Sequence, residues 1–286
     1  MLENQLKINI AEVYSAFNGI SSLYSVNSFS ELSKEILGAF SEDYVSIGYE
    51  SLSCEIGYEC LVKDQDLEKW TSFYNQVDIS HKVHVLVGLG WAFSKRKLVF
   101  SDYFDLFNDG EKWLILDGCG YFDALFRSRK TITNQIYPDL IPDEFLFAYY
   151  QGVGRQQLYS KEGDFLKIKE CIFSFPLRFQ GDMWRGVGIA SGYVGGLMDK
   201  DLSLYRFEGD KPFVFGFSIG KVSRLNAECF RKNDLVECKF LNLNILKNVQ
   251  KEINDFLRTN ILKGDSKNEF SLNLNHAESE LMHSVN

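Results

Sequence analysis

Apolar stretches of helical length recur along the chain, and each carries glycines near its middle. The four clearest span residues 82–97, 111–130, 143–159 and 182–198. Shorter apolar pieces lie at residues 66–76, 103–107 and 165–175. Charged residues gather near the ends of the long stretches, where they favour helix termini. The pattern predicts long helices that alternate with short ones.

The glycines follow a repeated spacing. A Gly-x-Gly step occurs in each long stretch at intervals of 30, 34 and 34 residues, and the four steps are Gly88/Gly90, Gly118/Gly120, Gly152/Gly154 and Gly186/Gly188. Weaker copies around residues 46–48 and 216–220 extend the series to six. Repeats of this length are typical of supersecondary units that stack on one another. The sequence therefore predicts an all-α fold of about six stacked helical hairpins, forming an α-solenoid or an α/α toroid.

Glycine inside a helix costs about 1 kcal/mol relative to alanine, so its recurrence indicates a compensating gain. Close approach of neighbouring helices supplies one, and Gly188, Gly192 and Gly196 are spaced to form one smooth helix face. A phosphate-binding loop is the alternative. No copy has the full G-x-G-x-x-G spacing or a Walker lysine, so we do not expect nucleotide binding.

Charge narrows the classes of partner. Thirty-one basic and 39 acidic residues give a net charge of −8 at pH 7, which excludes the basic surface that nucleic acids and anionic membranes require. Neither a secretory signal nor a membrane span is readable, so we expect a cytoplasmic protein. The six cysteines form no C-x-x-C pair, and we expect them to be reduced and buried. We assign residues 1–262 to a single helical-repeat domain and residues 263–286 to a polar tail.

The candidate chemistry lies beside the glycine steps. The residues immediately before the four steps are Val87, Asp117, Gln151 and Arg185, and Arg155 follows Gln151 by one helical turn. Stacked units would bring these positions into one row, with Asp117, Gln151 and Arg155 as candidate catalytic residues. Aromatic side chains that could form the walls of a binding site are Trp91, Trp113, Tyr121, Trp184 and Tyr193.

This row has two interpretations, and the sequence leaves both open. It could be the polar end of a ligand pocket, with Asp117 as acid or base and Arg155 as an anchor for an anion or a carbonyl. It could instead be a satisfied buried network that fixes the register of the helices. An aromatic content of 15%, with 24 phenylalanines, favours a hydrophobic small-molecule ligand.

Other titratable residues give weaker indications of a functional site. Arg178 and Asp182 lie four apart, and they form either part of the binding site or a local ion pair. Glu50 is a further carboxylate near the first repeat. His81 and His84 are three apart, but two histidines without a third ligand make a poor metal site, so we expect no metal.

The glycine-bearing strings resemble those of the UnbL-type proteins, a family of unknown function from bacterial enediyne polyketide gene clusters. The matching strings run in the same order and are Gly88-Leu-Gly90-Trp91-Ala92, residues 113–121, Gln151-Gly152-Val-Gly154-Arg155, and residues 182–196. Two departures from the family pattern stand out: Phe122 replaces a histidine, and Tyr149-Tyr150 replaces Phe-Asp before Gln151-Gly152. The resemblance implies a biosynthetic setting near a polyene polyketide, with pathway enzymes as possible partners, and it implies no particular cofactor.

Three functions follow from these observations. The first is an enzyme that modifies or cyclises a long hydrophobic polyene or polyketide intermediate. The second is a non-catalytic carrier or scaffold that shields such a molecule. A more distant third is a toroidal enzyme similar to terpene cyclases, although the sequence has no Asp-x-Asp-Asp or Asp-Asp-x-x-Asp string.

Overall fold

The computed structural model describes residues 5–18, 44–63, 66–97, 100–138, 141–197 and 210–226. Within these ranges the regular structure is helical, and no strand occurs. The prediction of an all-α fold is therefore confirmed. Seven long helices lie in the described ranges: α1 (Gln5–Asn18), α3 (Val45–Lys63), α5 (Lys82–Arg96), α6 (Asp109–Phe126), α7 (Leu146–Ser160), α9 (Leu177–Val194) and α11 (Asp210–Asn226).

Shorter helices connect the long ones, as the alternating pattern predicts. Two of them are α-helices, α4 (Glu68–Gln76) and α8 (Phe165–Phe173), and they fall on two of the three predicted short pieces. The third piece lies in a 3₁₀ helix, η4 (Phe100–Leu106), which is a common form for a short connection. The remaining single-turn connections are η3 (Ile79–His81), η5 (Arg129–Thr133) and η6 (Asp143–Phe145).

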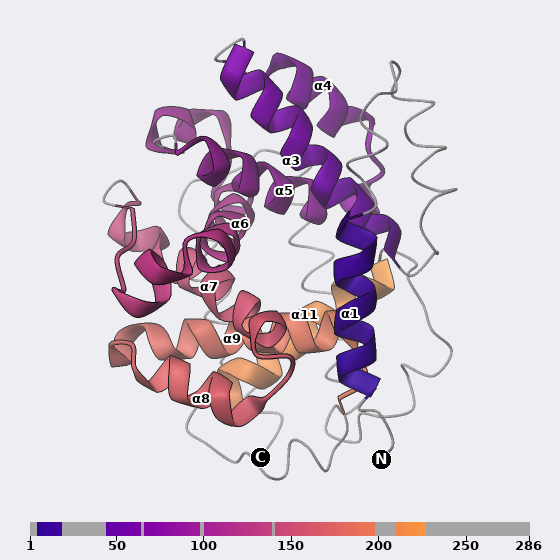
Figure 1. Ribbon diagram of the computed structural model, residues 1–286. Coiled ribbons are helices and arrows are strands. Elements are labelled where there is room, and N and C mark those ends of the chain that lie inside the picture. Colours follow the sequence, from indigo (N-terminus) through magenta and orange to yellow (C-terminus); the bar gives the residue numbers. More distant parts are fainter. Residues whose placement is uncertain are drawn as a thin grey trace.

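Each long helix from α3 onwards packs against the next long helix in the chain. Figure 1 shows α3, α5, α6, α7, α9 and α11 following one another around the middle of the molecule. Helix α1 contacts α3, the first helix of this series, and α9, the last but one. Its Asn9 Nδ2 donates to the carbonyl of Val194 at the end of α9 (3.0 Å), and its Glu12 accepts from the Tyr44 hydroxyl just before α3 (2.7 Å).

The Gly-x-Gly steps are the points at which neighbouring helices touch. Residues two apart on a helix face nearly opposite sides, so the first glycine of each step meets the preceding helix and the second meets the following one. A Cβ atom at any of these glycines would lie only 1.8–2.1 Å from a carbonyl oxygen of the neighbouring backbone. These oxygens belong to Glu50, Val87, Asp117 and Gln151 for the first glycines, and to Ile115, Tyr149, Met183 and Phe213 for the second.

The predicted smooth face on α9 is correct for two of its three glycines. Gly188 and Gly192 lie against α11, where added Cβ atoms would meet the carbonyl oxygens of Phe213 and Phe217. The prediction is wrong for Gly196. This residue lies beyond the end of α9 with a left-handed φ of 80°, and it faces the backbone of α1 instead.

The remaining general predictions are only partly tested. Cys54, Cys60 and Cys119 are buried free thiols, and Cys171 is free but half-buried. No helix in the described ranges is both long and apolar enough to cross a membrane. The tail at 263–286 and the boundary at residue 262 lie outside the described residues, as do Cys229 and Cys238.

Candidate functional site

The backbone contacts at the glycine steps place Asp117, Gln151 and Arg155 together. The carbonyl of Asp117 on α6 faces Gly152 of α7, which sets these two helices at the same level. Gln151 Nε2 donates to Asp117 Oδ2 (2.9 Å), and Arg155 Nη2 pairs with Asp117 Oδ1 (2.7 Å). Both oxygens of the Asp117 carboxylate therefore have partners on α7.

Glu50 and His84 complete the same group. Glu50 Oε1 lies 3.9 Å from Arg155 Nη1, and Glu50 Oε2 lies 3.3 Å from His84 Nδ1. The two residues come from α3 and α5, so the group joins four helices. We call these residues the central cluster, and its five members are Glu50, His84, Asp117, Gln151 and Arg155. Each of the four titratable side chains in it is at most 13% exposed.

The sequence indicated Glu50 only as a further carboxylate and did not assign it to the row, because the first repeat was placed around residues 46–48. In the structure, the carbonyl of Glu50 faces Gly88, as that of Asp117 faces Gly152. Glu50 therefore holds the position immediately before the glycine step, with Ser51 and Ser53 in place of the two glycines. The pattern that identifies Glu50 is a polar residue followed by small residues one and three positions later.

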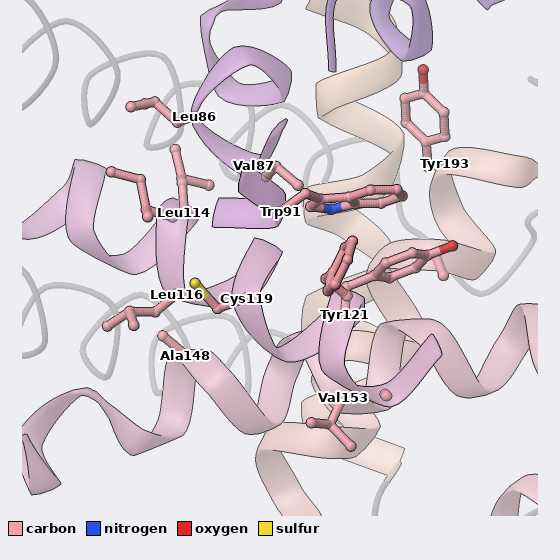
Figure 2. Packing of buried hydrophobic residues seen from close by; sticks show 14 of the residues in the cluster. Leu86, Val87, Trp91, Leu114, Leu116, Cys119, Tyr121, Ala148, Val153 and Tyr193 are labelled. Atoms are coloured by element: carbon pink, nitrogen blue, oxygen red, sulfur yellow. The ribbon is translucent and has the colours of Figure 1, made fainter. Parts of the chain in front are cut away.

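Aromatic rings line the central cluster. The Arg155 guanidinium lies 4.6 Å from the centre of the Tyr121 ring, and Tyr121 also stacks on Trp91 with ring centres 4.9 Å apart. The His84 ring lies 5.1 Å from that of Tyr193. Figure 2 shows Trp91, Tyr121 and Tyr193 on one side of the packed helices, with Leu86, Leu114 and Leu116 on the other.

Arg178, Asp182 and Arg185 have contacts outside the cluster. Trp113 and Trp184 are buried in the hydrophobic core. Asp182, which the sequence groups with Arg178, pairs with the buried Arg185 (3.1 Å). Arg178 lies in the exposed first turn of α9, where its guanidinium covers the Phe179 ring.

Burial changes the ionisation of the central cluster. It raises the pKa of the Asp117 carboxyl, and the Arg155 and Gln151 contacts offset that rise only in part. Burial alone would lower the pKa of the Arg155 guanidinium, but Asp117 and Glu50 reverse the direction and raise it. Burial also raises the pKa of the Tyr121 and Tyr159 hydroxyls, so both side chains stay neutral.

Several polar atoms of the cluster have no hydrogen-bond partner among the residues that the structure describes. His84 Nε2, Gln151 Oε1 and Arg155 Nε are buried without a hydrogen bond anywhere in the described structure. A buried polar atom without a partner costs about 1–3 kcal/mol, and folded proteins satisfy nearly all of them. The cluster therefore has hydrogen-bonding capacity that the described residues do not use.

His81 lies beside the cluster but has its own contacts. Its Nδ1 is 2.8 Å from Ser46 Oγ, and its ring stacks on Tyr49 at 4.7 Å. His84, in contrast, faces Glu50. The two histidines thus serve different partners, and no group of three or more metal-ligating side chains occurs among the residues the structure describes.

We expect His81 to make the protein less stable in acid. Burial, reinforced by the nearby His84, lowers the pKa of His81 to about 4 from its usual 6.5. The unfolded chain therefore binds more protons than the folded one between these values, and stability falls as the pH drops from 6.5 to 4. In thermal denaturation across this range, His81→Gln should lose less stability than the parent protein. Asp117 titrates in both proteins, so its contribution cancels in the comparison. Parallel curves of stability against pH for the parent and His81→Gln would contradict the lowered pKa of His81.

The fold and the site define a class: an all-α protein whose successive long helices touch through glycines, and in which four of these helices contribute to a buried charged cluster. The chain belongs to the family described as "Protein of unknown function (DUF1702)", whose model matches residues 31–235. The match includes every long helix from α3 to α11. No curated protein and no solved structure matches the chain.

Proposed function

We propose that the chain is a biosynthetic protein of the UnbL type, associated with enediyne polyketides. In this proposal it binds a long hydrophobic polyene or polyketide intermediate at the central cluster. The observation that carries the proposal is the set of buried polar atoms without partners in that cluster. A ligand held there would satisfy them, and the rings of Trp91, Tyr121 and Tyr193 would contact its apolar part.

The alternative, a network that only fixes helix register, explains less. The contacts between glycines and carbonyls already set the register through the backbone, without any side chain of the cluster. A purely structural network would also be expected to satisfy its own polar atoms. The unsatisfied atoms of His84 and Gln151 therefore favour a ligand.

We further propose that the long helices close into an α/α toroid with the cluster at its centre. Two contacts between helices that are not neighbours in the series support this. Arg155 on α7 reaches Glu50 on α3, and Tyr193 on α9 reaches His84 on α5. Helix α1, which contacts both α3 and α9, would cover the junction between the ends.

Within this proposal the protein either modifies or cyclises its ligand, or carries it between pathway enzymes. Enzymatic modification needs an acid or base that can reach the ligand. The carrier function is favoured by one observation, that both oxygens of Asp117 already have partners. Asp117 alone therefore does not establish catalysis.

Binding can be measured with two fluorescent tetraenes, parinaryl alcohol and parinaric acid, whose emission rises in apolar surroundings. We expect saturable binding of at least one probe. Gln151→Leu removes a polar atom of the cluster and should weaken that binding by about tenfold, the effect of roughly one hydrogen bond. Arg178→Gln, which changes an exposed side chain outside the cluster, should bind as the parent does.

Two results would overturn the proposal. One is the absence of saturable binding for both probes in a protein that unfolds cooperatively. The other is equal binding by the parent and Gln151→Leu, which would place the ligand away from the cluster. Mass spectrometry of small molecules that copurify with the protein provides an independent check, since a polyene or polyketide is expected among them.

A further inference from the structure

Glu50 contacts both Arg155 and His84 in the central cluster. One carboxylate oxygen is directed to the Arg155 guanidinium (3.9 Å) and the other to the His84 ring (3.3 Å from Nδ1). A carboxylate can only accept hydrogen bonds when ionised, so Nδ1 of a neutral His84 must carry the proton. Nε2 then has a free lone pair. This buried atom is one of those without a partner.

Gln151 presents a second acceptor. Its Nε2 donates to Asp117, so the amide orientation is set by the network and Oε1 is the remaining atom. Oε1 is buried without a partner among the described residues, and the whole residue is only 1% exposed. The two unsatisfied atoms of these side chains therefore both accept hydrogen bonds, and a ligand group that meets them must donate.

The charge of the cluster disfavours an anionic ligand. It contains two carboxylates, Glu50 and Asp117, and the single guanidinium of Arg155 already faces both. Arg155 Nε remains as a hydrogen-bond donor, but the positive charge of this side chain is already balanced by the carboxylates of Asp117 and Glu50. A carboxylate or phosphate would add negative charge to a buried group that is already negative, at a large desolvation cost.

We infer that the polar end of the ligand is an uncharged hydroxyl, as in an alcohol, enol or phenol, that donates to His84 Nε2. Glu50 is the positioning residue that holds His84 in the accepting tautomer. This inference rests on the proposed function and adds to it the class of ligand and the group that recognises it. A histidine oriented by a carboxylate, with its second nitrogen directed at a hydroxyl, is also the arrangement of a general base.

The test compares parinaryl alcohol with parinaric acid, which share a chain and differ in the polar end. At neutral pH the parent protein should bind the alcohol at least about tenfold more tightly than the acid. His84→Phe removes the acceptor but keeps a ring against Tyr193, so this preference should disappear while binding of the acid is unchanged. Arg178→Gln should retain the full preference.

Glu50→Gln tests the positioning role without removing His84. The amide oxygen should face Arg155, which leaves the amide NH₂ facing His84 Nδ1. The imidazole proton then moves to Nε2, which becomes a donor. The variant should lose affinity for the alcohol and gain it for methyl parinarate, whose ester only accepts. Long-range ¹H–¹⁵N correlation spectra should show the change of tautomer at His84 directly.

The outcomes separate this inference from the proposed function. If both probes bind equally to the parent, or the acid binds better, the inference is overturned while a ligand site remains. If His84→Phe keeps the preference, the hydroxyl does not meet His84. If neither probe binds, the proposed function itself is overturned, and this inference falls with it. A tautomer that is unchanged in Glu50→Gln, as seen in the spectra, overturns the role of Glu50 even in a variant with reduced stability.

Discussion

Alanine in place of Gly152 should destabilise the protein by about 3 kcal/mol or more. The added Cβ would lie 1.8 Å from the Asp117 carbonyl oxygen and 2.8 Å from the Tyr121 nitrogen. Both atoms belong to the backbone of α6, so no side-chain rotation relieves the clash and the two helices must move apart. Overpacking of a core typically costs 1–3 kcal/mol, and a backbone clash lies at the upper end or beyond. The melting temperature should fall by at least roughly 6 °C.

Gly181→Ala is the matched control. Gly181 also lies within a long helix, α9, but an added Cβ would meet only the Pro212 side chain at an ordinary 3.7 Å. The substitution should leave stability unchanged or raise it by up to about 1 kcal/mol, because alanine favours the helix. Equal effects of the two substitutions would show that Gly152 matters through helix propensity and not through contact between helices.

Replacing Arg155 with methionine should cost about 3–5 kcal/mol of stability, the usual effect of removing one partner from a buried ion pair. The guanidinium lies against the carboxylates of both Asp117 and Glu50, and its loss leaves two negative charges buried together. Thermal or urea denaturation measures the loss. The exposed Arg178→Met provides the control, and because it removes only a surface cation–π contact it should change stability by less than about 1 kcal/mol.

A double-mutant cycle shows whether the ion pair is the cause. Asp117→Asn alone should also destabilise the protein, because Arg155 then keeps only the more distant Glu50. Arg155→Met combined with Asp117→Asn should cost clearly less than the sum of the single changes, since the second change removes one of the unpaired charges. Strictly additive costs would mean that the two side chains do not interact in the folded protein.

The glycine spacing was enough to predict the contacts on which the cluster depends. Two glycines separated by one residue face opposite sides of a helix, so the pattern implies a helix with close neighbours on both sides. Asp117 and Gln151 hold the same place before their steps and therefore lie at the same level of adjacent helices. Arg155 follows one turn later on the same face.

Glu50, His84 and Asp182 show what the local pattern could not predict. At the first repeat, serines replace the glycines, so the spacing that identified the other steps is missing and Glu50 was not assigned to the row. His84 joins the cluster because α5 packs beside α3, which brings its ring to Glu50. The residues around His84 in the sequence give no indication of this tertiary contact. Asp182 lies four residues after Arg178 and three before Arg185, and both spacings allow contact on a helix. The structure pairs it with the buried Arg185.

A crystal structure of the full chain, purified with the molecules that accompany it from cells, tests the central claim most directly. We expect the Arg155 guanidinium between the carboxylates of Asp117 and Glu50, and density for a bound molecule that meets His84 Nε2 and Gln151 Oε1. Carboxylates found on opposite sides of the molecule would contradict the described cluster. Density in which protein atoms or water alone satisfy these two acceptors would contradict its assignment as a ligand site.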